Sequence, residues 1–222
     1  MEHLDSWKDL LNPEFYIKLG GFWLVLFIVF AETGLFIGFF LPGDSLLFVS
    51  GIYSHEIINR TFGIFQNDFI ETSILALCIS LAAIVGNETG YYFGYRAGDS
   101  LYKKEDSFWF KKKYLYQAHD FFEKHGSLAV IMARFLPIIR TFIPIVAGIV
   151  KIDKKKFLRD NIIGGILWSF ILIYAGHYLD KFFLTQFGIN LKAHLEYIIL
   201  AIVLVTTLPV LLKLFFGKRN KK

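Results

Sequence analysis

The chain has 222 residues, of which 55% are hydrophobic, 19% are charged and 25 are Phe, and its mean hydropathy is +0.50. This composition excludes an ordinary soluble enzyme, which would carry more charge, and predicts an integral membrane protein. The formal net charge of +5 is concentrated in segments 103–113, 151–159 and the tail 217–222. We interpret these segments as cytoplasmic flanks under the positive-inside rule and not as a nucleic-acid-binding surface. The single Cys78 excludes a disulfide framework and a Cys-based metal site.

The first half of the chain predicts a surface helix, an interrupted apolar block and one membrane span. Residues 1–20 alternate charged and apolar positions, which is typical of an amphipathic interfacial helix. Residues 22–53 form an apolar block that is interrupted by Glu32 and, further on, by a Pro-Gly break. Residues 55–71 are polar enough to form a loop, whereas residues 72–95 are long and apolar enough to cross the membrane as one helix.

The second half predicts a similar order of elements. Residues 98–125 are charged and aromatic, which favours a helical connection on the membrane surface. Residues 127–150 form a second apolar block, which is broken by prolines. Residues 162–179 and 195–216 are predicted as two further spans, joined by a loop over 180–194. The chain is therefore predicted to be a multi-pass, all-α membrane protein.

The basic segments also predict how the second block lies in the membrane. If the basic tail is cytoplasmic, the last two spans place segment 151–159 inside, and span 72–95 must end inside as well. Block 127–150 then lies between two cytoplasmic segments and forms a re-entrant hairpin. Its arms of about 11 residues would each reach about 16 Å, half of a hydrocarbon core about 30 Å thick. Block 22–53 would be the matching hairpin from the other side, and two opposed hairpins, each followed by a span, make an inverted repeat of the transporter type.

Four charged residues interrupt the two blocks, namely Glu32 and Asp44 in the first and Arg134 and Arg140 in the second. An Asp or Arg at the centre of a membrane helix costs about 2.5–3.5 kcal/mol. Four unpaired charges would thus cost on the order of 10 kcal/mol, comparable to the stability of a whole domain. We therefore expect the four side chains to face one another or a polar cavity and to form a substrate site. Alternatively, Asp44 caps the second arm of its hairpin and the arginines extend to the cytoplasmic interface.

Further polar residues lie within the predicted spans. The candidate cavity-lining residues are Asn87, Glu88 and Asn161. Asn87 and Glu88 either line the cavity or lie near the cytoplasmic end of their span, and Asn161 either lines it or packs between helices. Glycines at 86, 90, 94 and 98 recur every four residues, which predicts a smooth face for close helix packing.

Several stretches in a fixed order resemble the DedA family, which is also described by the SNARE-associated or VTT domain. The matching stretches are Glu32-Thr33-Gly34-Leu35, Phe40-Leu41-Pro42-Gly43-Asp44, Gly86-Asn87, Ala133-Arg134-Phe135, Arg140-Thr141 and Asn161 with Gly164 and Trp168. The resemblance covers roughly residues 30–180 and implies a membrane core over 21–180 with two opposed re-entrant hairpins. It also implies essential membrane-embedded acids and arginines at Glu32, Asp44, Arg134 and Arg140.

The resemblance further implies a role in moving lipids, notably undecaprenyl phosphate recycling in bacteria, with dependence on the proton motive force. Two positions depart from the family pattern. Asn87 stands where the family often has Asp, and Tyr95 stands where it often has Arg, which is found one residue later at Arg96. Both departures weaken the case for a functional role of this motif in the chain.

The residues and the resemblance together predict a flippase of the bacterial inner (cytoplasmic) membrane that is not an enzyme and has no cofactor or bound metal. Arg134 and Arg140 would hold a lipid phosphate, since the guanidinium fork suits bidentate phosphate recognition. Glu32 and Asp44 would carry protons or balance the arginines, with protons or Na⁺ as coupling ions, and the protein can be an oligomer. The alternatives are a proton-coupled transporter of small ions or drugs and a flippase or scramblase for phospholipids. A membrane phosphatase is disfavoured, because it would need a nucleophilic His with a basic phosphate signature and the sequence has no such arrangement. A scaffold without transport activity is disfavoured, because it would not need four charges in the membrane.

Overall fold

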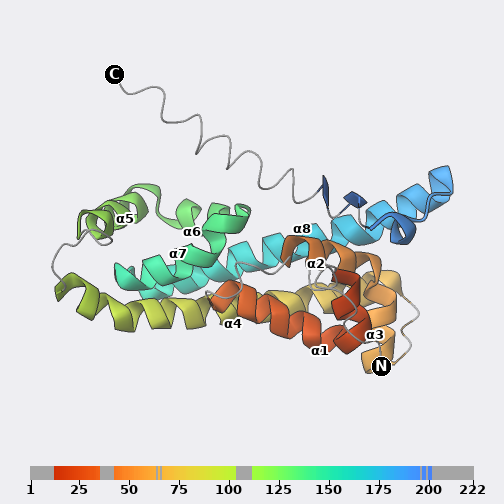
Figure 1. Ribbon diagram of the computed structural model, residues 1–222, viewed down its shortest axis with the longest axis horizontal. Coiled ribbons are helices and arrows are strands. Elements are labelled where there is room, and N and C mark those ends of the chain that lie inside the picture. Colours follow the sequence, from red (N-terminus) through yellow and green to blue (C-terminus); the bar gives the residue numbers. More distant parts are fainter. Residues whose placement is uncertain are drawn as a thin grey trace, which may run out of the picture. The chain divides into compact units, whose positions relative to one another are not determined.

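The computed structural model describes residues 13–35, 43–63, 65, 67–103, 112–195, 197–198 and 200–201. These residues are largely helical and include no strand, which confirms the predicted all-α class (Figure 1). In chain order the helices are α1 (Pro13–Gly34), α2 (Gly43–Ile52), α3 (Ser54–Phe62), α4 (Asp68–Lys103), α5 (Lys112–His125), α6 (Ser127–Ala133), α7 (Pro137–Ile149), α8 (Lys154–Phe187) and the short 3-10 helix η3 (Leu191–His194).

The chain divides into two compact units, and the helices α1, α4 and α8 contribute residues to both. Unit 1 comprises Met1–Val25, Pro42–Ala76 and Phe170–Lys222. Unit 2 comprises Leu26–Leu41 and Leu77–Ser169. The division does not follow the order of the predicted segments, because each long helix gives one end to each unit.

Helices α4 and α8 are long and apolar enough to cross a membrane, over Asp68–Ser100 and Lys154–Phe187. They contain the spans predicted at 72–95 and 162–179 and continue beyond both of their ends. The flanking residues are charged or aromatic, so they ended the apolar pattern in the sequence. They do not end the helix, because their helix propensities are ordinary.

Two predicted loops are partly helical. The loop predicted over 55–71 contains α3, whose residues Ile57 and Ile58 are buried while the rest of the helix is mostly polar. The loop predicted over 180–194 starts only after Phe187. Sequence analysis missed α3 because its segment is polar on average. An amphipathic helix needs only one apolar stripe, and such a stripe has little effect on the average polarity.

The second apolar block is interrupted at residues 134–136, before the first of its predicted prolines, whereas the second, Pro144, lies inside α7. Helix α6 ends at Ala133 and α7 begins at Pro137, a residue whose fixed φ suits the first position of a helix. The two arms have 7 and 13 residues, not about 11 each as the length of the block had predicted. The arms differ because the interruption at 134–136 lies closer to the start of the block than to its end. Gly126, with a φ of +52°, separates α5 from α6 before the block begins.

Some predicted segments lie outside the described residues. These are residues 1–12 of the interfacial helix, Pro42 of the first break, most of the span 195–216, and the tail 217–222. Within α1, Gly21 has a non-helical φ of 53°, so the helix is interrupted between the predicted interfacial segment and the first apolar block.

In unit 1, α2 and α8 pack closely through a pair of glycines. A Cβ atom at Gly51 would overlap the carbonyl oxygen of Ile173, and one at Gly176 would overlap that of Phe48. Each glycine therefore faces the carbonyl of the residue three positions before the other glycine. Small residues at such a crossing allow the two backbones to approach within direct contact.

Unit 2 contains the same arrangement between α4 and α7. A Cβ atom at Gly94 would overlap the carbonyl oxygen of Ile145, and one at Gly148 would overlap that of Tyr91. Tyr91 also stacks on Phe157, with ring centroids 4.6 Å apart, and its hydroxyl donates to the carbonyl of Ile152 at 2.6 Å. These contacts join α4, α7 and the start of α8 around one hydrophobic core.

Candidate functional site

Three of the four predicted site residues, Glu32, Arg134 and Arg140, lie in unit 2 and are buried there. Arg140, near the start of α7, donates through Nη2 to Oε1 of Glu32 on α1, and the two side chains are 5% and 3% exposed. The Cζ atom of Arg140 also lies 4.8 Å from the ring centroid of Trp168 on α8. The ion pair and the aromatic face together stabilise a guanidinium that has little access to water.

Arg134 occupies the break between α6 and α7 and is 2% exposed. Its Nη2 atom donates to the side-chain oxygen of Asn161 and lies 3.5 Å from the carbonyl oxygens of Ala83 and Asn161. Among the described residues no carboxylate lies within ion-pair distance of Arg134, and its Nε atom has no hydrogen-bond partner. Within the described part of the chain, the hydrogen bonds of this arginine all go to neutral oxygens.

Helix α8 makes room for the Arg134 side chain with two glycines. A Cβ atom at Gly164 would lie 3.5 Å from Cδ of Arg134, and one at Gly165 would lie 3.4 Å from its Nη2 atom. Larger residues at these positions would compete with the guanidinium for space. Gly164 stood out in the sequence only as part of the family-like stretch with Asn161, which did not predict Arg134 as its neighbour.

Asn161 connects Arg134 to two residues of α4. Its Nδ2 atom donates to the carbonyl of Ile84 at 3.1 Å and to Oε1 of the half-buried Glu88 at 3.3 Å. Glu88 is therefore the carboxylate that is linked to Arg134 through a single side chain. This arrangement brings together two of the three residues expected to line a cavity.

The third, Asn87, is buried next to the same group. Its amide can donate to Asn161 at 3.0 Å; turned over, its nitrogen donates to the Thr33 carbonyl at 3.0 Å and its oxygen accepts from Arg134 at 2.8 Å. The second orientation satisfies more partners, because the Asn161 oxygen already accepts from Arg134. We call Glu32, Asn87, Arg134, Arg140 and Asn161 the arginine site.

Asp44 lies in unit 1, in the first turn of α2, where a carboxylate interacts favourably with the positive end of the helix. Asp44 lies inside the helix, after its first residue Gly43, and the capping hydrogen bond that sequence analysis left open stays a prediction. That Asp44 faces the arginine site stays a prediction. Trp168 contacts Arg140. Sequence reasoning did not predict this contact, because the two residues lie on different helices.

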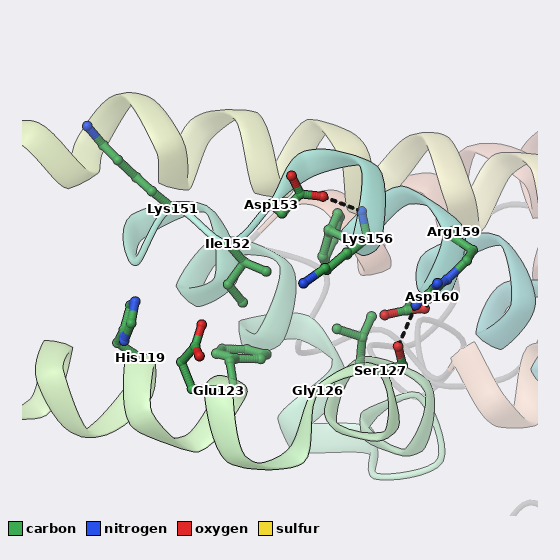
Figure 2. A pocket seen from close by; sticks show the side chains of 13 residues that line it. His119, Glu123, Gly126, Ser127, Lys151, Ile152, Asp153, Lys156, Arg159 and Asp160 are labelled. Atoms are coloured by element: carbon green, nitrogen blue, oxygen red, sulfur yellow. Dashed lines mark hydrogen bonds and ion pairs between the residues drawn. The ribbon is translucent and has the colours of Figure 1, made fainter.

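Unit 2 also holds a cavity of about 300 Å³ between α5, α6 and the start of α8 (Figure 2). Its charged lining residues are Glu123, Lys151, Asp153, Lys156, Arg159 and Asp160. Arg159 donates to Asp160 at 2.9 Å and to the Ser127 hydroxyl at 2.7 Å, and the backbone of Lys156 donates to Asp153 at 2.8 Å. Acidic and basic groups balance in this cavity, so it does not select an anion as the arginine site can.

Comparison with known proteins places these features in a wider group. The VTT domain matches residues 41–178, a range that includes Asp44, Arg134 and Arg140. The chain is 37% identical to an uncharacterised membrane protein of Mycobacterium tuberculosis, over 96% of this chain and 90% of that protein. It is 36% identical to the protein DedA of Escherichia coli, over 90% of this chain and 85% of that protein.

A further relative is the inner membrane protein YqjA of Escherichia coli, which is 31% identical over 79% of this chain and 74% of its own length. No solved structure matches the chain. These matches confirm the family resemblance that the motifs had predicted, and the names of two of these relatives describe membrane proteins.

Proposed function

The chain belongs to the VTT-domain family together with DedA and YqjA, and from this premise we propose that it is a lipid transporter of the bacterial inner membrane. Its substrate is a lipid with a phosphate headgroup, in the first place a polyprenyl phosphate such as undecaprenyl phosphate. Translocation breaks no covalent bond, so the proposed protein is a transporter and not an enzyme.

The observation that carries the proposal is the burial of Arg134 beside neutral oxygens. Arg140 binds the carboxylate of Glu32 directly, whereas Arg134 has no carboxylate within ion-pair distance among the described residues. The remaining positive charge can be balanced by Glu88 through Asn161 or by an anionic ligand. A phosphate suits this position, because its oxygens accept the parallel hydrogen bonds that an arginine fork offers.

Glu32 then competes with the phosphate for Arg140. When the headgroup enters, phosphate oxygens replace the Glu32 carboxylate, which takes up a proton or another cation. When the headgroup leaves, Glu32 pairs with Arg140 again and restores the arrangement seen here. In this mechanism Asp44 serves as a second acid, and protons or Na⁺ are the coupling ions. The long hydrocarbon chain of the lipid stays in the bilayer while the headgroup crosses.

The architecture proposed for this transport is an inverted repeat of two re-entrant hairpins. The paired-glycine crossings support it, because α2 meets α8 in unit 1 through the same carbonyl contacts by which α7 meets α4 in unit 2. In each case the second arm of one hairpin packs on a long, apolar helix from the other half of the chain. Transporters of this kind place their substrate site near broken helices, and Arg134 lies at such a break.

The decisive test is headgroup translocation in proteoliposomes, with polyprenyl phosphate, phosphatidylethanolamine and a soluble anion as substrates, each with and without a pH gradient. We expect transport of polyprenyl phosphate that is lost in Arg134→Lys and Arg140→Lys, because Lys cannot form the bidentate fork. Arg159→Lys is the matched control, since Arg159 belongs to the same unit but has a 60% exposed side chain.

The other outcomes distinguish the alternatives. Transport of phosphatidylethanolamine at an equal rate would make the protein a general phospholipid flippase or scramblase. Transport of the soluble anion alone would make it a proton-coupled carrier of small ions. Full activity of both lysine variants would contradict the phosphate-binding role.

Cysteine accessibility tests the hairpin. In a Cys78→Ser background, Lys124→Cys and Lys154→Cys flank the block formed by α6 and α7. Both cysteines should resist an impermeant thiol reagent added outside intact cells. Labelling of only one of them would show that the block crosses the membrane and that the inverted repeat is wrong.

A further inference from the structure

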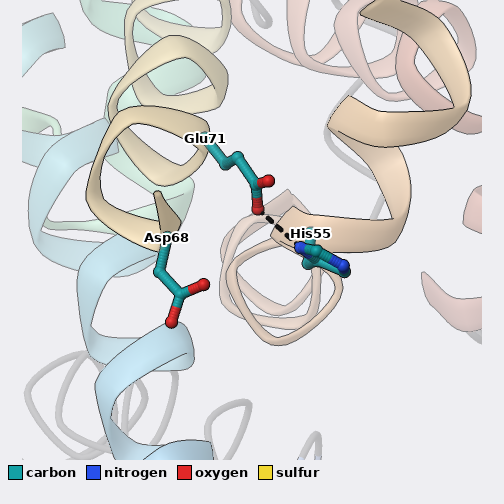
Figure 3. A group of neighbouring side chains, drawn as sticks. All are labelled: His55, Asp68 and Glu71. Carbon is teal, nitrogen blue, oxygen red and sulfur yellow. Dashed lines mark hydrogen bonds and ion pairs between the residues drawn. The ribbon is translucent and has the colours of Figure 1, made fainter. Parts of the chain in front are cut away.

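A second group of titratable side chains lies in unit 1, where α3 is next to the start of α4 (Figure 3). His55 comes from α3, and Asp68 and Glu71 come from the first turn of α4. Each offers one ligand atom, and these atoms all lie within 4.8 Å of one another. The geometry points to a binding site for a divalent transition-metal ion of the Zn²⁺ class.

Glu71 is the residue that most requires such a ligand. Its side chain is 1% exposed, and its Oε2 atom accepts from Nδ1 of His55 at 2.7 Å. Its Oε1 atom has no hydrogen-bond partner in the part of the chain that the structure describes. A buried carboxylate oxygen without a partner is costly, and a cation held between Glu71 and His55 would remove that cost.

The other two ligands leave the site open to solvent. The side chains of His55 and Asp68 are 61% and 54% exposed, so an ion can enter without a rearrangement of the helices. The Asn59 amide nitrogen lies 3.1 and 3.0 Å from the two ring nitrogens of His55, and its oxygen accepts from the backbone of Phe65 at 3.2 Å. Asn59 thus contacts the imidazole ring and limits its rotation.

A cavity of about 280 Å³ borders the group and is lined by His55 and Asp68 together with His177 and Asp180 of α8. Three protein ligands leave a fourth position of a tetrahedral ion for water or for one of these side chains. His177 already has a hydrogen bond between its Nδ1 and the Ser54 hydroxyl, at 3.1 Å.

The donor set selects the kind of ion. Imidazole with carboxylates suits Zn²⁺ and its first-row neighbours, whereas Ca²⁺ and Mg²⁺ prefer oxygen ligands alone. Sequence analysis did not predict this site, because its ligands are not spaced as a known motif and the segment between them was predicted to be a loop. Neither the site nor its test depends on the proposed lipid transport.

One neighbour competes with the ion. Nζ of Lys181 donates to Oδ2 of Asp68 at 3.0 Å and places a positive charge beside the proposed ligand. Metal binding must therefore weaken or share this ion pair. Removing the charge with Lys181→Met should tighten metal binding, whereas removing the ligand with Asp68→Asn should weaken it.

The experiment uses the full chain, purified in detergent without a polyhistidine tag and freed of metal by a chelator. Titration with Zn²⁺ should show one saturable site per chain, and Zn²⁺ should raise the melting temperature, because an ion that binds only the folded state stabilises it. His55→Gln, Asp68→Asn and Glu71→Gln should each weaken binding by about tenfold or more. Glu56→Gln is the matched control, because Glu56 lines the same cavity but pairs with Lys192 outside the cluster.

Absence of saturable Zn²⁺ binding would overturn the proposal, as would equal binding by the wild type and all three ligand variants. If Glu71→Gln fails to fold, Asp68→Asn and Lys181→Met decide, since both change exposed side chains. Opposite shifts in Zn²⁺ affinity support the site, and equal or absent shifts contradict it. Binding of Co²⁺ by the wild type provides a further readout, because its visible absorption reports nitrogen and oxygen ligands directly.

Discussion

Units 1 and 2 bring their helices together in the same way but place their charged groups differently. In each unit two helices cross at a pair of glycines, one on each helix. Each glycine faces the backbone carbonyl that lies three residues before the glycine of the other helix. In unit 2 the charges of Glu32, Arg134 and Arg140 are buried among apolar helices, with at most 5% of each side chain exposed. In unit 1 the cluster at the start of α4 buries only Glu71 and leaves His55 and Asp68 in contact with solvent.

This difference indicates which charged contacts contribute most to the stability of each unit. A buried ion pair cannot be broken on one side without leaving a desolvated charge, whereas an exposed pair is replaced by water at little cost. The crossings, which are alike, should respond alike to substitution. The charged groups should respond very differently.

The largest effect is expected from breaking the buried pair in unit 2. Glu32→Leu removes a buried carboxylate that Arg140 binds and should lower the free energy of unfolding by about 3–5 kcal/mol. The double variant Glu32→Leu with Arg140→Leu should recover most of this loss, since it removes both partners of the pair. Denaturation in detergent measures both variants.

The matching experiment in unit 1 is Asp68→Asn, which breaks the exposed pair with Lys181. It should change the free energy of unfolding of the metal-free protein by about 0–1 kcal/mol. A loss as large as that of Glu32→Leu would contradict the contrast between the two units.

The next largest effect concerns the shared crossings. Gly176→Ala in unit 1 and Gly148→Ala in unit 2 each place a Cβ atom against a backbone carbonyl, and each should cost about 1–3 kcal/mol. Gly90→Ala is the milder control, because its Cβ would lie 3.3 Å from the side chain of Pro144. If only one of the two crossings is sensitive in thermal melting, the units are not built alike.

A smaller effect is expected from single tyrosine hydroxyls. Tyr91→Phe removes the hydrogen bond to the Ile152 carbonyl in unit 2, and Tyr174→Phe removes the one to the Ser73 hydroxyl in unit 1, which is 2.6 Å long. Each loss should cost about 0.5–1.5 kcal/mol. Tyr91→Phe should be the more costly, because it leaves a backbone carbonyl unsatisfied while Ser73 also bonds to the carbonyl of Phe69. Equal melting temperatures of both variants and the wild type would show that neither bond contributes.

The sequence alone predicted the helical class, the two long apolar helices and an interruption at the prolines of the second block, because hydropathy and proline act locally; Pro144, however, lies inside α7. It also identified Glu32, Arg134 and Arg140 as residues that need partners. It could not pair Arg140 with Glu32 or place Trp168 over Arg140, since these contacts join segments that are far apart in the chain. It missed α3, where polar residues outnumber the two buried isoleucines.

The smallest effect is expected from the exposed pair of Lys151 and Asp99 in unit 2. This pair tests whether unit 2 is sensitive to substitution only where its charges are buried. Lys151 donates to Asp99, and this hydrogen bond raises the pKa of Lys151 above its usual value. A raised pKa means that the pair stabilises the fold fully below the ordinary lysine pKa and loses this effect as the pH rises through the raised one. Asp99→Asn should therefore lower the melting temperature slightly at pH 7, by less than Tyr91→Phe, and the difference from the wild type should vanish at high salt or above the raised pKa. A salt-insensitive loss as large as that of the buried pair would show that exposure does not set the energetic difference within unit 2.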